Sequence, residues 1–97
     1  MEKIIVTKHK AVEQYIREAG LCEEGAICYP SVSAEFVEGK HVIGTVPFHI
    51  AAAAEYFTEI KLTLRKHLFN TELTLDQLKA MVKEVRTYKV TIIDNIK

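Results

Sequence analysis

The segment between His41 and Ala54 constrains the fold of this chain more than any other. A short apolar run, Val42-Ile43, leads into Gly44-Thr45, and Pro47 follows at the head of an alanine-rich stretch. Proline is favoured in the first turn of a helix because the N–H that it lacks would have no partner there. The pattern therefore predicts a strand over 41–44, a tight connection and a helix over 47–57, which is the repeating unit of α/β domains.

The other segments continue this alternation. Helical spacing of apolar residues predicts a helix over 10–19, and Thr74-Leu-Asp-Gln77 has the pattern of a capping box that begins a third helix. We expect 33–40 to be a linker. Alternating strands and helices favour a mostly parallel sheet covered by helices, so we expect one compact α/β domain over 1–97 with about five strands and three helices. Four further strands are predicted from short apolar and β-branched runs, over 3–7, 26–29, 59–65 and 87–93.

Composition excludes several classes of function. Thirteen basic and thirteen acidic residues cancel, so the chain lacks the positive charge that general binding to long nucleic acids or membranes requires. It has no run of the roughly 18–20 apolar residues that would span a bilayer and no pattern of a signal peptide, so we expect a cytoplasmic protein. Cys22 and Cys28 match no common metal or redox motif, and we expect free thiols in a reducing compartment.

Polar residues follow three of the predicted strands. In a parallel sheet, ligands bind beyond the carboxyl ends of the strands, so these residues are expected on one rim. Gly44 would let the backbone approach a ligand, Thr45 adds a hydroxyl, and the helix that Pro47 opens would attract an anion to its free N–H groups. The three rim segments are Thr7-Lys8-His9, Gly44-Thr45 with His49, and Arg65-Lys66-His67.

Metal chemistry and carboxylate chemistry are poorly supported by the same residues. No HxxxH or HxH pair falls on one element, and no pair of carboxylates has acid–base spacing. Cys28 stands at the end of a predicted strand, but no neighbouring residue marks it as a nucleophile. The residues therefore favour a phosphate site with imidazoles nearby, and they predict no metal and no cofactor.

Three segments resemble one known family. Ile4-Ile-Val-Thr-Lys-His9 is similar to its amino-terminal strand, which ends in Ser/Thr-Arg-His. Val42-Ile-Gly-Thr-Val-Pro-Phe-His-Ile-Ala-Ala52 is similar to its central signature, Val-Ile-Gly-Thr-Leu-Pro-x-His-Leu-Ala-Ala. Leu73-Thr-Leu-Asp-Gln-Leu-Lys-Ala-Met81 is similar to its carboxy-terminal helix. The family is a group of small accessory proteins of type III CRISPR systems.

The resemblance implies a ring nuclease that degrades cyclic oligoadenylate messengers, chiefly cyclic tetra-adenylate. It also implies a Rossmann-like fold related to the CARF sensor domains, and a homodimer. Lys8 stands where the family usually has arginine, which keeps the charge but loses the bidentate fork. Lys10-Ala11 replaces a Pro-Gly pair and changes the shape of the first turn.

A metal-independent mechanism is consistent with these residues. The ribose 2′-OH of the substrate would attack the adjacent phosphorus and leave a 2′,3′-cyclic phosphate, while the protein aligns the ribose, stabilises charge and moves protons. We assign His49 as the general acid for the leaving 5′-oxygen, with His9 as its rival. Thr45 and the amides after Pro47 would hold the phosphate, and Lys8 and His9 would position or neutralise it. The remaining ligand-binding candidates are Thr7, Gly44, Arg65 and Lys66.

Two other classes of function remain open from the sequence. The chain could sequester or sense the same messenger without cleaving it, or it could be a scaffold with no nucleotide site. A single small domain offers only a shallow rim, so we expect a homodimer with the ring on its two-fold axis. Phe48 and Tyr56 are the expected interface residues.

Overall fold

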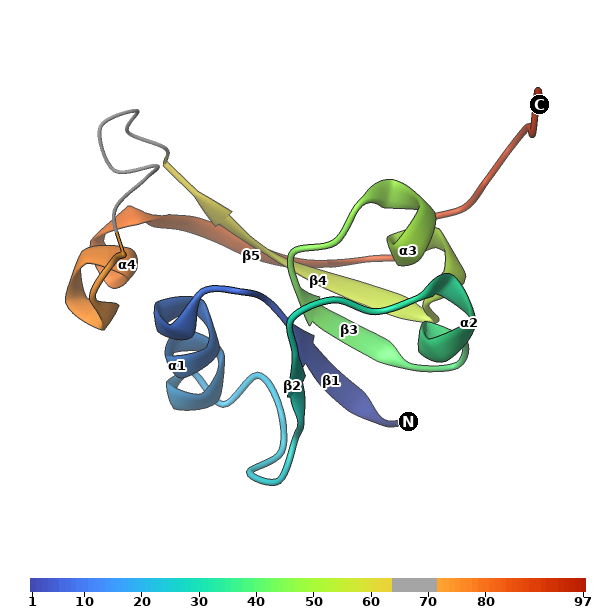
Figure 1. Cartoon of the computed structure of the whole chain (residues 1–97). Coiled ribbons are helices and arrows are strands. Elements are labelled where there is room, and N and C mark those ends of the chain that lie inside the picture. Colours follow the sequence, from blue (N-terminus) through green and yellow to red (C-terminus); the bar gives the residue numbers. More distant parts are fainter. Residues whose placement is uncertain (64–71) are drawn as a thin grey trace.

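The computed structural model describes residues 1–63 and 72–97, whose strands form one sheet in the order β2-β1-β3-β4-β5. The pairings of β1 with β2, β1 with β3 and β3 with β4 are parallel, and β5 runs antiparallel to β4. Figure 1 shows this mixed sheet with helices on both sides, which confirms the expected α/β architecture. The strands are β1 (Lys3–Val6), β2 (Cys28–Tyr29), β3 (His41–Gly44), β4 (Tyr56–Leu62) and β5 (Val82–Tyr88).

The two central strands form the innermost part of the core. Ile4 and Ile5 of β1 and Val42 of β3 are fully buried, and Ile43 is 1 % exposed. Consecutive buried residues, rather than alternating ones, are typical of parallel strands covered on both faces. Each such side chain contributes about 1.5–3 kcal/mol when it leaves water, so this short stretch supplies much of the driving force for folding.

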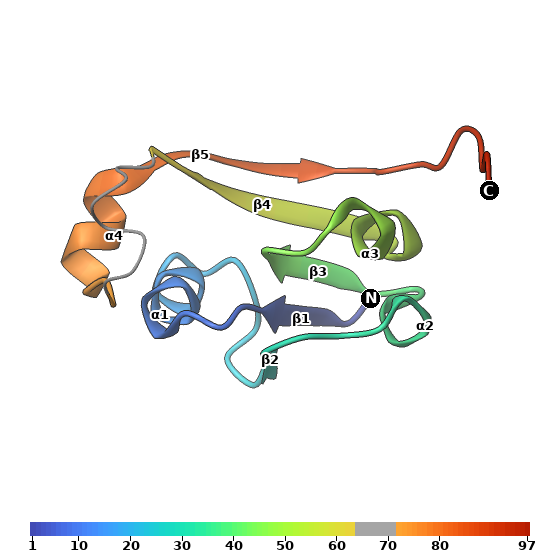
Figure 2. The ribbon, with the colours of Figure 1, turned by 45° about the horizontal axis from the view of Figure 1, so that its top comes forward.

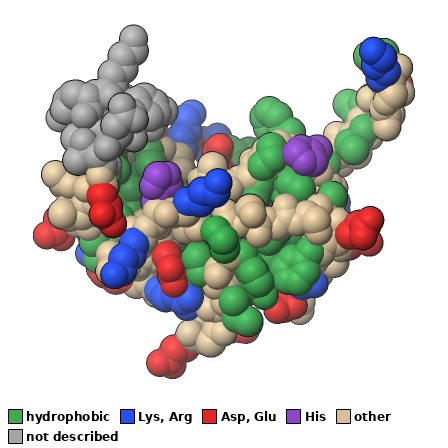
Figure 3. All heavy atoms as spheres, in the orientation of Figure 1, with side chains coloured by type: hydrophobic (Ala, Val, Ile, Leu, Met, Phe, Trp, Pro, Cys, Tyr) green, Lys and Arg blue, Asp and Glu red, His purple; other side chains and the backbone are tan. Residues whose placement is uncertain are grey.

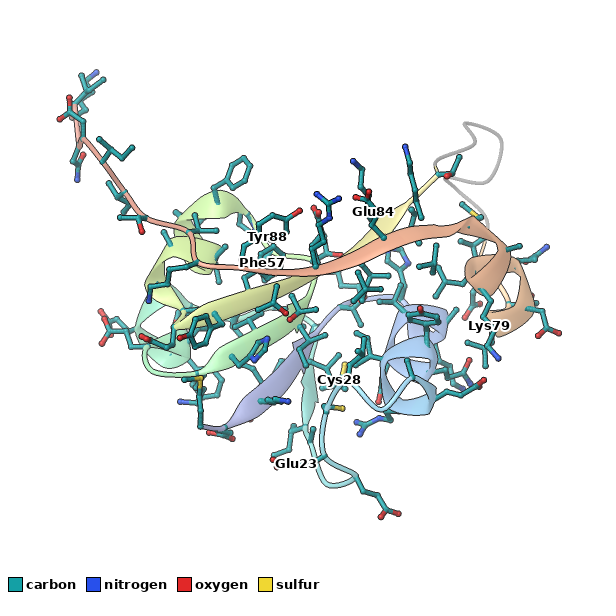
Figure 4. The ribbon with its side chains drawn as sticks, turned by 180° about the vertical axis from the view of Figure 1, so that it is seen from behind. Glu23, Cys28, Phe57, Lys79, Glu84 and Tyr88 are labelled. Carbon is teal, nitrogen blue, oxygen red and sulfur yellow. The ribbon has the colours of Figure 1, made fainter. Side chains whose placement is uncertain are left out.

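One face of the sheet is covered by α1 (Lys10–Glu18) and α4 (Leu75–Met81). The side chain of Ile5 packs there in one cluster with Ile16 of α1 and Leu78 of α4. Figure 4 shows the molecule from behind, with Lys79 of α4 directed toward α1. There Lys79 forms an ion pair with Glu18. The amino end of α4 carries the predicted capping box, because the side chains of Thr74 and Gln77 each accept a backbone N–H.

The opposite face is covered by α2 (Ala34–Val37) and α3 (Phe48–Ala53). Ile4 packs there in a second cluster with Val37 of α2 and Ile50 of α3. Figure 2 shows that α2 and α3 lie toward one end of the sheet, whereas α1 and α4 lie toward the other. None of the helices in the described ranges is long and apolar enough to cross a membrane.

The segment expected to be a linker contains α2, so the described residues form four helices rather than three. The Oγ atom of Ser33 accepts the N–H of Phe36 at 3.2 Å and caps this single turn. Val37 is fully buried against the sheet. The turn has too few residues to produce a readable helical period, which is why the sequence pattern did not predict it.

The second half of the chain changes from helix to strand earlier than predicted. The helix expected over 47–57 ends at Ala53, because Tyr56 and Phe57 pair with β3 instead. β4 therefore covers Tyr56–Leu62 rather than 59–65, and β5 covers Val82–Tyr88 rather than 87–93. Val82 and Val85 continue the helical spacing of the apolar residues in α4 but belong to β5, since β-branched residues fit a half-buried strand better than a helix.

A chain of side-chain hydrogen bonds crosses three strands near the amino ends of β3 and β4. Nε2 of His41 lies 2.6 Å from Oγ1 of Thr58, and that oxygen lies 2.7 Å from Oγ1 of Thr87. Thr58 is 4 % exposed, so its hydroxyl relies on these partners. Burial, and next the charge of Lys3, lower the pKa of His41 below its usual 6.5.

We expect the fold to lose stability as the pH falls through 6.5. Because the folded-state pKa of His41 is lowered, the unfolded chain binds the proton more tightly, and protonation favours unfolding. Urea denaturation at pH 8 and pH 5.5 measures the effect. The difference in midpoint between the two pH values should shrink in His41→Gln, and an unchanged difference would exclude His41 as its source.

Candidate functional site

The carboxyl ends of β1 and β3 meet as the sequence predicted. Val6 and Gly44 are partners in the parallel ladder, and the N–H of Thr45 donates to the carbonyl of Val6 at 3.0 Å. This contact places the Thr7-Lys8-His9 turn directly beside Gly44-Thr45. The first predicted rim segment and the Gly44-Thr45 part of the second are thus together, and Arg65, Lys66 and His67 of the third lie outside the described residues.

A glycine is needed at position 44 for β3 to pack against β1. Its φ angle is +137°, and a Cβ placed on it would lie 2.1 Å from the carbonyl oxygen of Val6. The space that the missing side chain leaves is therefore filled by the neighbouring strand, whereas the sequence suggested that it would admit a ligand. The exposed group that this turn offers is Thr45, which follows Gly44 at the surface.

The turn after β1 is held by Thr7. Its N–H donates to the carbonyl of Tyr29 at 3.0 Å, and its Oγ1 accepts the N–H of His9 at 3.1 Å. Thr7 is 7 % exposed, so its main role is to shape the turn. Lys8 and His9 are exposed, and His9 is the N-cap residue of α1. The turn therefore presents a cation and an imidazole to solvent on a constrained backbone.

The Pro47 region differs from the prediction. Pro47 is the N-cap residue rather than the first helical residue, with ψ of 162°, and its carbonyl accepts the N–H groups of Ile50 and Ala51. Figures 1 and 2 show that the chain after β3 turns back over the sheet before α3 begins. His49 therefore stands on a helix of six residues, apart from the carboxyl end of β3, rather than beside Gly44.

The exposed groups form an open surface along one side of the molecule. His49 is exposed, like Lys8, His9 and Thr45. Figure 3 shows histidine side chains over α3 and at the start of α1, with a Lys or Arg side chain between them. Such a surface is suited to an extended anionic ligand that contacts several groups at once. It can supply positive charge, a hydroxyl and imidazoles for proton transfer.

A cavity of about 210 Å³ lies elsewhere, lined by Arg17, Cys22, Glu23 and Glu24. Its two carboxylates disfavour an anionic ligand.

Burial and the neighbouring Glu13 raise the pKa of Cys28, whose thiol faces the carbonyl of Thr7 at 3.9 Å. Figure 4 shows Cys28 on the face that α1 covers. A thiol with a raised pKa is a poor nucleophile, which argues against Cys28 as a nucleophile.

Sequence reasoning missed one neighbour of the rim. Tyr29 ends β2 and is the ladder partner of Val6, which places it at the same edge of the sheet. Ligands bind beyond the carboxyl ends of parallel strands, and this rule selected Thr7 and Thr45. It selects Tyr29 as well if aromatic side chains are counted among the groups that can contact a ligand. Among the described residues there is no group of three His, Cys, Asp or Glu side chains that could hold a metal ion.

The comparison with known families covers most of the chain. A family described as “Putative CRISPR-associated protein (Cas_VVA1548)” matches residues 4–91. The chain belongs to this family. The matched residues include both turns of the rim and every described strand and helix apart from the first residue of β1. No curated protein and no solved structure shows significant similarity to this member of the CRISPR-associated family.

We expect Gly44→Ala to destabilise the protein by about 2 kcal/mol or more, because the new methyl group would collide with backbone that cannot move aside and alanine disfavours this φ. Gly25→Ala is the matched control, since a Cβ there meets nothing within 4 Å. Chemical denaturation gives both values. Equal stability of the two variants would contradict the role assigned to Gly44.

Proposed function

We propose that this CRISPR-associated protein is a metal-independent ring nuclease that binds and cleaves cyclic oligoadenylate, chiefly cyclic tetra-adenylate. Membership of a CRISPR-associated family over residues 4–91 supports the biological setting. The resemblance of the Gly44-Thr45-Val-Pro-Phe-His49 segment to the ring nuclease signature supports the reaction. The observation that carries the proposal is the pairing of the Lys8 turn with the Gly44-Thr45 turn through the Val6 contact.

The open surface fits this substrate in its chemistry. A cyclic oligonucleotide is a closed chain of phosphodiesters, so it can contact groups that lie apart along the protein. Lys8 and Thr45 would hold one phosphate at the rim next to His9, and His49 on α3 would contact another part of the same ring. The formal charge of the chain is zero, so binding would rely on this local arrangement rather than on overall attraction.

The reaction requires little chemistry from the protein. The substrate carries its own nucleophile, a ribose 2′-OH, which attacks the adjacent phosphorus while the 5′-oxygen leaves. The 2′-OH loses its proton, the 5′-oxygen gains one, and the product carries a 2′,3′-cyclic phosphate. Holding the ribose in line contributes several kcal/mol, and a proton donor such as His49 adds about 10²–10⁴-fold.

One assay separates the classes of function. We expect the protein to convert cyclic tetra-adenylate to linear products in excess EDTA, and the early products to carry 2′,3′-cyclic phosphate ends. Chromatography with mass detection measures both. Cleavage that stops in EDTA and returns with a divalent ion would refute the mechanism. An intact ring retained by the protein would indicate a binding module, and neither binding nor cleavage would indicate a scaffold.

We expect His49→Ala to slow single-turnover cleavage by about 10²-fold while ligand affinity changes little, because a general acid acts mainly in the transition state. His9→Ala is measured in parallel, since His9 is exposed in the Lys8 turn at the rim, whereas His49 is exposed on α3. A rate unchanged in His49→Ala but lowered in His9→Ala would transfer the proton-donor role to His9.

We also propose that the working unit is a homodimer with one ring on its two-fold axis. Phe48 is 83 % exposed on α3, and a partner subunit would cover it. Tyr56, the other expected interface residue, packs against His41 on the opposite face of the sheet, so a single flat interface would not contain both side chains. Light scattering should give a dimer and calorimetry one ring per two chains. A monomer, or one ring per chain, would exclude this assembly.

A further inference from the structure

Tyr29 lies next to the rim and forms an aromatic pair with Phe36 of α2. Tyr29 ends β2, its backbone carbonyl accepts the N–H of Thr7, and its residue position is aligned with Val6 in the ladder. Val6 is aligned in turn with Gly44 on its other side. Neighbouring strands are about 4.8 Å apart, so Tyr29 and Gly44 are separated by about 10 Å across the sheet. A single nucleotide can bridge that separation.

The ring of Tyr29 meets that of Phe36 edge to face, with 5.1 Å between centroids and an interplanar angle of 67°. Phe36 belongs to α2, where the Ser33 cap fixes its backbone, and Nζ of Lys40 lies 4.7 Å from its ring centroid. Despite these neighbours Phe36 is 38 % exposed. Figure 3 shows hydrophobic side chains gathered over β2 and α2, on the same side of the molecule as the exposed histidines.

We propose that the Tyr29–Phe36 pair is the surface on which a nucleobase of the ligand stacks while its phosphate lies at the Lys8 and Thr45 turns. This inference rests on the proposed function and assigns the recognition of a base within it. Every nucleobase has a π-face that stacks on an aromatic side chain, and Lys40 adds a positive charge beside the stack. The fixed backbone of Tyr29 holds the platform at a constant distance from the phosphate position.

The test uses the full chain with adenosine 5′-monophosphate and with ribose 5-phosphate, which lacks the base. We expect the monophosphate to shift the NMR signals of the Phe36 ring and ribose 5-phosphate to leave them in place. Phe36→Leu keeps an apolar side chain but removes the ring, and should weaken binding of the monophosphate about fivefold or more. Tyr88→Leu is the matched control, because Tyr88 is also 38 % exposed and lies on β5, away from β2.

The outcomes separate this inference from the proposed function. Equal shifts with both probes, or unchanged affinity in Phe36→Leu, would overturn the base platform, and cleavage of cyclic tetra-adenylate would then still stand. Binding of the monophosphate at Phe36 without any binding of cyclic tetra-adenylate would refute the ring substrate and support the platform. A shift from dimer to monomer in Phe36→Leu by light scattering would assign the pair to a subunit interface and overturn the inference.

Discussion

The parallel pairing of β1 with β3 is the interaction on which the rest of the structure depends. It buries Ile4, Ile5, Val42 and Ile43 on both faces, and each helix layer packs on one alternate set of these side chains. The pairing ends where Gly44 meets Val6, so close that a Cβ has no room. A residue other than glycine would push the strands apart at the point where the core and the candidate site join.

This contact also determines how the candidate site is built. The N–H of Thr45 donates to the carbonyl of Val6, the last residue of β1. The turn that begins at Thr7 follows Val6 directly. Groups that are almost forty residues apart in the sequence thus share a stable backbone frame. The side chains of Lys8, His9 and Thr45 are exposed there. If the proposed cleavage takes place here, the ligand or a second subunit would have to exclude water from the reacting groups.

The two ends of the sheet have different roles in this arrangement. At the carboxyl ends of β1 and β3, polar groups face solvent and are available to a ligand. Toward the amino ends of β3 and β4, polar groups are used within the protein, where His41, Thr58 and Thr87 satisfy one another. Histidine therefore has two uses in this chain. Burial, and next the charge of Lys3, lower the pKa of His41, which contributes to the structure, whereas His9 and His49 are exposed to solvent.

Several elements of the fold could be predicted from the sequence alone. The bounds predicted for β3 are those found, the capping box at Thr74 is present, and α1 ends one residue before the predicted position, because caps and buried runs are local signals. The prediction was less accurate where a local preference competes with strand pairing. Tyr56 and Val82 lie in helix-like patterns but join β4 and β5, since the sheet offers them ladder partners.

Local patterns located the candidate residues, but only the tertiary structure decided which of them meet. The sequence by itself determined that Thr7, Lys8 and Gly44-Thr45 follow parallel strands and so share an edge. Tertiary structure alone decided that Gly44 faces backbone and that His49 is carried away from the rim. The physical reason is that strand ends are set by local runs of residues, whereas the direction of the chain after Thr45 is set by where α3 can bury Ile50 and Ala51 against the sheet.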